Sequence, residues 1–561
     1  MKTDRKNAFI RLLAYIWKHF KGKLLLVGGC IVVSSLSSVV ATVFMQRLID
    51  ECITPGITQG LAAVWPGLVQ ILLSMASIYV LGVAATFIYT RTMARVTQGT
   101  LKHMRNDMFG KMQSLPVKYF DTHAHGDIMS TYTNDTDAIR QLIGQSLPLF
   151  VQSSLTVTAI FIMMLYYSLW LTLAVVLFVA GMLTITRHFA GFSARYMMRQ
   201  QRALAAEEGF IEEMLQGQKV IQVFCHEEES KKAFAKLNDQ LFEDGEAAHR
   251  YGNVLMPILG NVGNLMYVLL AVIGSLLVAF HAPNPSLAGT SSITVGIIIS
   301  FLGMTRQLSQ IIGQTSMQVS MVAMGLAGAG RVFELMDEEP EQDEGYVTLV
   351  NAKRDEKGEL QEAEGPTGLW AWRHPHSADG SVTYTELTGD IRLADVDFGY
   401  TPEKLVLHDV TLYAKPGQKI AFVGATGAGK TTITNLINRF YEIPDGKIRY
   451  DGINITKIRK PDLRRSLGVV LQDVNLFTGT VMENIRYGRL DATDEECIQA
   501  AKLANADDFI TRLPEGYNTM LTGNGAGLSQ GQRQLISIAR AAVADPPIQG
   551  RKRWYRREWT I

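Results

Sequence analysis

The sequence has little of what marks several common protein classes. Its 561 residues carry 54 basic and 53 acidic side chains, and this balance gives no argument for a nucleic-acid-binding protein. Only four cysteines occur, and their wide separation argues against both a disulfide framework and a C-x-x-C zinc site. The first 23 residues are basic and amphipathic, and they lack the short apolar run of a cleavable signal peptide.

Charge is also missing from four long stretches of the chain. A helix needs about 20 apolar residues to cross a bilayer. The first two stretches are long enough for one crossing each, and the other two for two crossings each, with turns near Tyr167–Leu169 and Ala282–Pro285. The sequence therefore predicts six membrane crossings and argues against a soluble protein. The charge-free stretches are residues 24–46, 52–90, 141–186 and 251–305.

Basic residues are concentrated in alternate connections. Residues 1–23 carry seven Lys or Arg, residues 91–140 carry seven and residues 187–250 carry nine, whereas the other connections carry almost none. By the positive-inside rule, the N-terminus and both long connections are predicted to be cytoplasmic, in a multi-pass protein of the plasma membrane. Helical spacing in the long connections indicates that the membrane helices continue into the cytoplasm.

The character of the chain changes after Arg306. Residues 338–365 are rich in Glu, Asp, Gly and Lys, which favours a solvated linker. Trp370 and Trp372 suggest that part of 366–389 packs on a neighbour. From Gly389 onwards, short apolar strands alternate with helical segments, as in an α/β domain.

A glycine-rich loop carries the chemistry of this region. Residues Lys419–Val423 are predicted to form a buried strand that leads into G-x-x-x-x-G-K-T and then a helical run, the order in which this motif binds phosphate. Its glycines let backbone N–H groups turn toward phosphate oxygens, and the helix N-terminus adds its positive dipole. We expect Lys430 to bind the β- and γ-phosphates and Thr431 to bind Mg²⁺, so ATP and Mg²⁺ are the predicted cofactors. The candidate binding residues are Gly424, Thr426, Gly427, Gly429, Lys430, Thr431 and Thr432.

Three further motifs occur in order around this loop. They are Val396-Asp-Phe-Gly-Tyr400, Val470-Leu-Gln472-Asp473 and Leu528-Ser529-Gln530-Gly531-Gln532. With the loop, they resemble the A-loop, Q-loop and signature of ABC ATPases. The resemblance implies that Tyr400 stacks on adenine and that Gln472 contacts Mg²⁺ and the attacking water. It also implies that Ser529, Gly531 and Gln532 bind the γ-phosphate held by the opposite subunit. The family usually has LSGGQ, so Gln530 is a departure at a tolerant position.

The membrane half resembles ABC exporters as well. Residues 115–130 resemble the segment around the first coupling helix, and residues 220–227 resemble the second coupling segment. The resemblance implies an α-helical polytopic membrane domain with six transmembrane helices, followed by an α/β P-loop NTPase domain of the ABC type. The expected parts are a membrane domain at 1–336 with an elbow helix and two coupling segments, a linker at 337–389, an ATP-binding domain at 390–548 and a non-homologous basic tail at 549–561.

The resemblance breaks abruptly near residue 548. The family places an apolar strand ending in Asp-Glu after the signature helix and a switch His later; the Asp orders Mg²⁺ and the Glu polarises the attacking water. Here, residues 549–561 hold five basic residues in thirteen, which a buried central strand does not tolerate because unpaired buried charge is costly. We therefore expect the ATP-binding domain to be incomplete at its C-terminus and the chain to be deficient in hydrolysis.

Two interpretations of residues 549–561 stay open. One is a functional basic and aromatic appendix that touches lipid headgroups or RNA. The other is a shifted reading frame or a truncated gene. We favour the second, because the break falls inside a motif-dense region.

The resemblance also implies partners and a function. Two half-transporters form a dimer that couples ATP binding and hydrolysis to export of hydrophobic or amphipathic, multidrug-like compounds across the lipid bilayer, with no role for nucleic acid. Asn524 stands where many exporters carry Glu, which favours a heterodimer. The charge-free spans offer no fixed charge for a small ion. The alternative is a fragment that binds ATP, or pairs with a partner, without hydrolysis.

Overall fold

The fold is described from a computed structural model. The structure describes residues 2–545 apart from 288–291, 366, 377–378, 402 and 472–473, and at some helix positions, mainly 185–194, it describes the backbone alone. The chain forms two compact units. Met1–Gln113 and His125–Glu338 form the first, and Ser114–Ala124 with Glu339–Ile561 form the second. The segment 114–124 therefore belongs to the second unit although the first unit flanks it in sequence.

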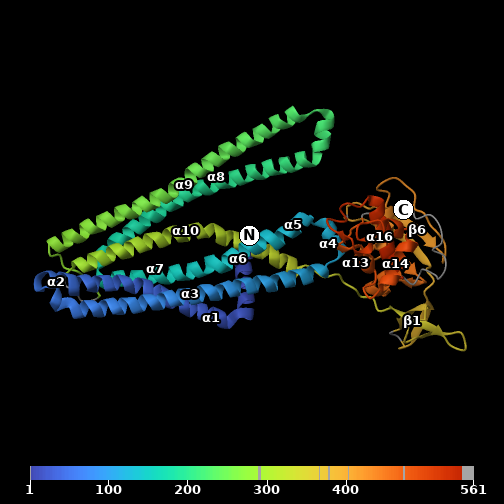
Figure 1. The fold of residues 1–561 in the computed structure, drawn as a ribbon, viewed down its shortest axis with the longest axis horizontal. Coiled ribbons are helices and arrows are strands. Elements are labelled where there is room, and N and C mark those ends of the chain that lie inside the picture. The colour runs from blue at the N-terminus through green and yellow to red at the C-terminus, as the bar shows by residue number, and fades with distance from the viewer. Residues whose placement is uncertain are drawn as a thin grey trace. The chain divides into compact units, whose positions relative to one another are not determined.

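Long helices dominate the described part of the first unit (Figure 1). They are α1 (Lys2–Arg47), α3 (Leu61–Gln113), α7 (Leu147–Tyr167), α8 (Leu169–Phe224), α9 (Glu227–Ala279) and α10 (Val295–Asp337). Short helical segments connect them: η1 (Leu48–Ile53), α2 (Thr54–Gln59), α5 (His125–Ser130), η2 (Thr131–Asp135), α6 (Thr136–Gln141) and η3 (Leu142–Ser146).

Five of the described helical stretches are long and apolar enough to cross a membrane, which confirms the predicted helical membrane region. A shorter apolar helix, Leu169–Thr184, begins α8. A turn at Ser168 separates α7 from α8, as the sequence predicted, while the total of six crossings stays a prediction. The five stretches are Asn7–Gln59, Ala62–Gln113, His125–Tyr167, Gly260–Ala279 and Val295–Thr315.

The long helices continue past the charge-free stretches, as predicted from their spacing. Helix α3 runs to Gln113, and α8 runs to Phe224. Helices α8 and α9 lie side by side and are joined by a short turn at Cys225 and His226. Residues 220–227, which resemble the second coupling segment, therefore form the end of a helical hairpin.

A partly buried carboxylate contact joins η1, the segment after α1, to α10. Asp50 in η1 accepts hydrogen bonds from Thr294 Oγ1 at 2.6 Å and from the N–H of Gly296 at 3.0 Å, so it caps the N-terminus of α10. A Cβ at Gly296 would lie 2.6 Å from the carboxylate, so only glycine admits this approach. A further contact joins α1 itself to α10, since Ser300 Oγ donates to the carbonyl of Thr42 at 2.8 Å.

Residues 337–389, expected to be a linker, instead contain a small antiparallel sheet of the second unit. The strand order is β2-β1-β3-β4. The side chains of Val347, Leu349 and Trp372 are buried in the core of the unit. The polar composition that suggested a linker belongs largely to turns such as 355–359, whereas apolar residues within the strands face the core. The strands are β1 (Thr348–Arg354), β2 (Leu360–Glu362), β3 (Trp370–Pro375) and β4 (Val382–Glu386).

A second antiparallel sheet, with the order β6-β5-β7-β8, lies beside the first. Its strands are β5 (Ile391–Phe398), β6 (Leu407–Ala414), β7 (Asp445–Tyr450) and β8 (Ile453–Asn454). The Trp372 ring contacts that of Tyr450 at a centroid distance of 5.4 Å, and Trp372 Nε1 donates to Asp451 Oδ2 at 3.0 Å. These contacts join the two sheets into one core.

A helical part completes the described second unit. Its core is built around Ile485, Cys497 and Ile536. It comprises β9 (Gly479–Thr480), α13 (Val481–Arg486), α14 (Asp494–Leu503), α15 (Asp507–Ile510), η5 (Gly516–Asn518), β10 (Met520–Leu521) and α16 (Gln530–Val543). The remaining helices of the unit are α4 (Val117–Thr122), α11 (Lys430–Ile437), η4 (Ile455–Lys457) and α12 (Lys460–Ser466).

The buried strand predicted at 419–423 does not form. Residues 415–425 contain no strand, and Val423 is 93% exposed. Residues 467–471 are likewise without strand structure, and Leu471 is 55% exposed. Among the described residues, no strand pairs with either segment. A strand is stable only where neighbouring strands pair with its N–H and C=O groups. In the described structure neither segment has such a neighbour, so its apolar sequence alone does not make it a strand.

Candidate nucleotide-binding site

The glycine-rich loop turns directly into α11. Gly427 and Gly429 have φ of 85° and 84°, a left-handed conformation that glycine adopts at no steric cost. A Cβ at Gly429 would also lie 2.6 Å from Leu407 Cδ2. The two glycines therefore let the loop approach the N-terminus of α11, where free N–H groups and the helix dipole favour an anion.

Lys430 folds back over this loop. Its Nζ donates to the carbonyl oxygens of Gly424 and Ala425, both at 2.8 Å. Phosphate oxygens carry charge and are stronger acceptors than carbonyls, so an anion in the loop would compete for the same ammonium group. Backbone N–H groups, this ammonium and the hydroxyls of Thr431 and Thr432 together form a donor set that fits a triphosphate.

Fewer of the described residues are suited to bind Mg²⁺ than to bind phosphate. Thr431 is exposed on the first turn of α11, where its hydroxyl suits a Mg²⁺ ion that keeps several waters and phosphate oxygens. Gln472, the other expected ligand, lies outside the described residues. Within the described ranges, no group of three or more His, Cys, Asp or Glu is arranged to hold a metal ion.

Tyr400 lies beside the loop in an aromatic cluster. Its ring contacts Phe398 and Tyr441 at centroid distances of 5.1 and 5.0 Å. Its hydroxyl lies 3.2 Å from Thr432 Oγ1, so the residue expected to stack on adenine is next to the phosphate loop. Tyr400 remains 38% exposed, which leaves part of the ring available to a base.

The signature residues form the start of α16. Ser529 Oγ accepts the N–H of Gln532 at 3.2 Å, and Gln532 Oε1 accepts the N–H of Ser529 at 2.9 Å, which is a capping box. Ser529 and Gly531 are exposed. In the described part of the chain, no hydrogen bond or ion pair joins α16 to residues 424–432. The signature is therefore built as a helix N-terminus but is not part of this chain's own phosphate loop.

Sequence reasoning missed Tyr441, whose ring belongs to the aromatic cluster and whose hydroxyl contacts α4. Tyr441 is only 8% exposed, and its hydroxyl donates to Asp121 Oδ2. Burial, together with this hydrogen bond, raises the pKa of the Tyr441 hydroxyl. The available signal was the pair of aromatic residues in Arg439-Phe-Tyr441-Glu442, directly after the phosphate-binding helix.

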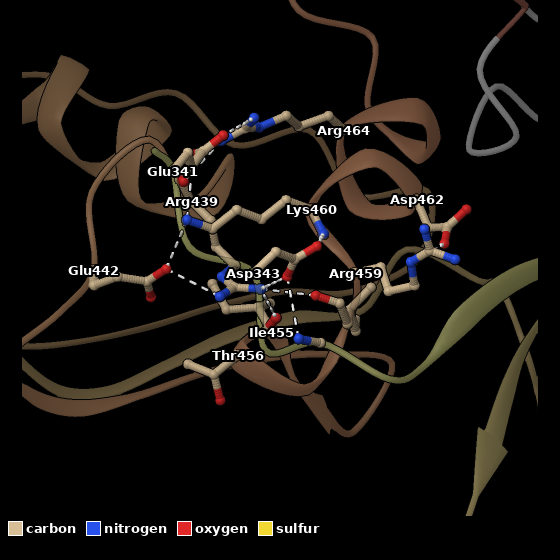
Figure 2. A network of polar contacts seen from close by, with 12 residues as sticks. Glu341, Asp343, Arg439, Glu442, Ile455, Thr456, Arg459, Lys460, Asp462 and Arg464 are labelled. Atoms are coloured by element: carbon tan, nitrogen blue, oxygen red, sulfur yellow. Dashed lines mark hydrogen bonds and ion pairs between the residues drawn. The ribbon is translucent and has the colours of Figure 1, made fainter. Parts of the chain in front are cut away.

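A charged cluster surrounds the turn that follows α11 (Figure 2). Lys460 Nζ lies 3.2 Å from Glu341 and 3.0 Å from Glu442, and the Lys460 side chain is 7% exposed. Pairing offsets the cost of burying these charges. The cluster consists of Glu341, Asp343, Arg439, Glu442, Lys460 and Arg464, and its other ion pairs join Arg439 to Glu442 and to Asp343, and Arg464 to Glu341.

Two protein families match this chain, one in its membrane half and one in the half that holds the phosphate loop. Residues 24–324 match the family described as ABC transporter transmembrane region, and residues 407–549 match the family described as ABC transporter. The ABC transporter ATP-binding protein YfiC of Bacillus subtilis is 34% identical over 545 residues, which cover 97% of this chain and 82% of that protein.

Two further relatives carry names that include a transported compound. The fatty acid ABC transporter ATP-binding/permease protein of Mycobacterium tuberculosis is 33% identical over 472 residues, covering 84% of this chain and 68% of the relative. The ATP-dependent lipid A-core flippase of Pseudomonas aeruginosa is 29% identical over 552 residues, covering 96% and 83%.

A solved structure shares the fold. The structure of a bacterial Atm1-family ABC exporter with ATP bound aligns with a TM-score of 0.71 and 22% identity, covering 94% of this chain and 85% of that one. A helical membrane region followed by a phosphate-loop ATP-binding domain defines an ATP-dependent membrane transporter. The chain belongs to the ABC transporter family, as an exporter-type half-transporter with fused membrane and ATP-binding regions.

Proposed function

We propose that this chain binds ATP with Mg²⁺ at residues 424–432 and acts, with a second half-transporter, to export hydrophobic or amphipathic compounds across the plasma membrane. The observation that carries the proposal is the junction of the loop with α11, where Gly427 and Gly429 are left-handed and Lys430 lies over the loop beside Tyr400. The same chain also carries the membrane helices of a transporter, which is why we assign the nucleotide site to transport.

Each residue of the site binds a different part of the nucleotide. Lys430 and the N–H groups at the start of α11 neutralise phosphate charge, Thr431 orients the magnesium, and Tyr400 stacks on the base. When bound, ATP supplies a γ-phosphate whose charge suits an exposed helix N-terminus. Ser529 and Gly531 at the start of α16 offer such a terminus to a second chain, so the dimer would be the complete binding unit.

Asn524 does not decide between a homodimer and a heterodimer. It has a φ of 58°, a left-handed conformation that Asn tolerates better than most residues. Its Oδ1 also accepts the N–H of Leu476 at 2.7 Å. Asn at this position therefore has a local structural reason, and the choice of partner stays open.

The cargo we propose is a lipid-like amphiphile. The named relatives handle a fatty acid or lipid A-core. In this chain, one face of α9 lines a cavity of about 830 Å³ that combines His249, Arg250 and Asn253 with the apolar Ile258 and Leu265. A lining that combines charged and polar groups with apolar ones suits a molecule with a headgroup and a tail.

The orientation rests on the basic residues. The N-terminal 23 residues and the connections 91–140 and 187–250 carry nearly all Lys and Arg of the membrane half. We therefore infer a cytoplasmic N-terminus and a cytoplasmic ATP-binding domain.

Binding without hydrolysis is the second candidate function. Residues 419–423 lead directly into the phosphate loop, and they are exposed and outside any described sheet. Phosphoryl transfer depends almost entirely on positioning and charge stabilisation, so a loop without a rigid support is poorly suited to turnover. We infer that the chain retains nucleotide binding but is deficient in hydrolysis.

Nucleotide binding and phosphate release test both parts of this proposal. We expect the purified full chain in lipid nanodiscs to bind ATP and Lys430→Ala to weaken binding at least about tenfold, because it removes a charge that pairs with phosphate. The exposed Lys419→Ala is the matched control and should bind as the parent does. Equal binding by Lys430→Ala and the parent contradicts the site, and phosphate release at the rate of an intact exporter contradicts deficient hydrolysis.

A further inference from the structure

Tyr400 lies in the loop between β5 and β6, outside both strands. In this loop the chain reverses after Phe398, and the N–H of Val406 donates to the carbonyl of Phe398 at 2.7 Å. A loop positions a side chain less precisely than a helix or a strand does. The orientation of the Tyr400 ring, and with it the stacking of a base, therefore depends on the side chains that surround the ring.

Two buried aromatic rings contact Tyr400 edge to face. The ring of Tyr441 lies at a centroid distance of 5.0 Å and an angle of 87°, and the ring of Phe398 at 5.1 Å and 83°. Tyr441 and Phe398 also contact each other, at 5.6 Å. These two residues are 8% and 3% exposed, whereas Tyr400 is 38% exposed. The two buried rings therefore support the third, whose exposed part stays available to a base.

The hydroxyl of Tyr400 points to one face of α11. It lies 3.2 Å from Thr432 Oγ1, and Asn435 Nδ2 donates to it at 3.4 Å. Thr432 and Asn435 are three positions apart, so they lie on the same face of the helix. Both contacts are long for hydrogen bonds, so they orient the tip of the ring without holding it strongly. The aromatic contacts therefore supply most of the support.

Tyr441 stands on a turn that is itself firmly held. The turn 438–442 directly follows α11, and Arg439 within it has a φ of 50° that reverses the chain. The guanidinium of Arg439, which is almost fully buried, donates to the carbonyls of Ile455 and Ile458 at 3.1 and 2.7 Å. Releasing a buried charge from its partners is costly, so this turn keeps its shape. Tyr441 is thus a fixed support for a ring that stands on a loop.

We propose that Tyr441 is a positioning residue for the base of the nucleotide. Its edge contact holds the Tyr400 ring in the orientation that stacks on adenine, so the site selects a nucleoside triphosphate over a bare polyphosphate. The inference rests on the proposed binding of ATP at residues 424–432 beside Tyr400. It goes further in naming the residue on which selection for a ligand with a base depends.

This role of Tyr441 predicts a selective loss of affinity. Within the described part of the chain, no hydrogen bond, ion pair or ring contact joins Tyr441 to residues 424–431. Replacing Tyr441 should therefore weaken binding of the base while phosphate binding is kept. An edge-to-face pair of rings contributes about twofold to tenfold to an equilibrium constant beyond the area that it buries, which sets the size of the loss.

Two ligands that share a triphosphate and differ in the nucleoside test this role. Binding of ATP and of inorganic tripolyphosphate, each with Mg²⁺, is measured by isothermal titration calorimetry on the full chain in lipid nanodiscs. The ratio of the two affinities reports the contribution of the nucleoside. We expect Tyr400→Ala to lower this ratio at least about fivefold, because stacking on the base is lost. Tyr441→Leu should lower it at least about threefold and leave the affinity for tripolyphosphate within about twofold.

Matched variants separate positioning of the base from general stability. Tyr441→Phe keeps the ring and loses only the hydroxyl contact with Asp121, so its ratio should stay within about twofold of the parent. Tyr441→Met fills the space with a flexible side chain but has no ring, so it should behave as Tyr441→Leu does. Tyr400→Ala combined with Tyr441→Leu should be no worse than Tyr400→Ala alone, because Tyr441 acts through Tyr400. Tyr517→Leu, which removes a tyrosine from the helical part of the unit, is the control and should keep the parent ratio.

Each result decides a separate point. If the parent binds neither ligand, the proposed function and this inference both fail. If the parent binds both ligands but Tyr400→Ala, Tyr441→Leu or Tyr441→Met keeps the parent ratio, the inference fails and the phosphate site stands. Equal losses of ATP and tripolyphosphate binding in Tyr441→Leu and Tyr441→Met would also overturn it, because Tyr441 would then support the whole fold. A fall in the ratio as large in Tyr441→Phe or Tyr517→Leu as in Tyr441→Leu would do the same, since the ring contact would not be its cause.

Discussion

The sheet β6-β5-β7-β8 and the segments 419–423 and 467–471 belong to the same unit, yet their apolar side chains have opposite environments. Val396 and Ile448 in the sheet are fully buried, whereas Val423 and Leu471 in the segments are largely exposed. In β5, hydrogen bonds run to β6 on one side and to β7 on the other. In the described structure, neither segment has such a neighbour.

The difference shows that apolar composition alone does not bury a strand. Folding a strand into a sheet requires partners for its N–H and C=O groups as well as an apolar surface to cover. The sheet β6-β5-β7-β8 has both within residues 391–454, and Trp372 of the neighbouring sheet packs on it as well. The apolar segments beside the phosphate loop have the composition without the partners.

The largest loss of stability is expected when Trp372 is replaced. Replacing it by Ala removes a fully buried side chain that contacts Tyr450 and donates to Asp451. The free energy of opening of β5 and β7 should fall by about 3–5 kcal/mol, which is the usual cost of emptying a large aromatic site. Amide hydrogen exchange of these strands in the full chain measures it. A change under about 1 kcal/mol would show that the two sheets do not share a core.

A smaller, pH-dependent effect is expected in the charged cluster. Burial raises the pKa of Glu341, but hydrogen bonds and charge from Arg464 and Lys460 outweigh burial and hold the pKa below its ordinary value of 4.5. A lowered pKa means that the contribution of Glu341 to stability is present above about pH 4.5 and is lost as the pH falls through the folded-state value.

The measurement is the thermal midpoint of the full chain between pH 6 and pH 3, in the parent and in Glu341→Gln. The parent should lose stability more steeply below about pH 4.5, because the glutamine variant has no carboxylate at this position to protonate. Exposed Glu495→Gln serves as the control. Identical profiles for the parent and Glu341→Gln would mean that the cluster adds nothing to the sheet core it borders.

The smallest change in stability is expected from substitutions in the exposed apolar segments 419–423 and 467–471. Val423→Ser should change the free energy of unfolding by no more than about 0.5 kcal/mol, since the side chain is almost fully exposed. The same substitution at Val396 in β5 should cost several times more, since that side chain is fully buried. Thermal unfolding of both variants compares the two regions directly. A large loss in Val423→Ser would mean that this segment is buried after all.

Much of the candidate site was predictable from sequence, because its parts are local. The left-handed glycines at 427 and 429, the helix that starts at Lys430 and the capping box at Ser529 are each set by a few consecutive residues. Tyr400 was predicted from a motif, and the structure places its hydroxyl beside Thr432. The charge-free stretches likewise predicted the helical membrane region.

Other features were beyond sequence reasoning, because they depend on residues far apart in the chain. Tyr441 and Asp121 are separated by 320 positions, and nothing in either segment alone indicates the other. The sheet at 348–386 was mistaken for a linker because its turns are rich in Glu, Gly and Lys, while the residues that bury Trp372 lie in β7 and in the loop after it.

The sequence by itself determined that this protein has a membrane part and a glycine loop that leads into a helix, because hydropathy runs and loop–helix motifs depend on residues close together in the chain. Only the tertiary structure decided which apolar segments are buried, that residues 348–386 pack on the ATP-binding region, and that α4 is held by a tyrosine next to the nucleotide site. Those outcomes depend on hydrogen-bonding and packing partners that the fold brings together from distant positions.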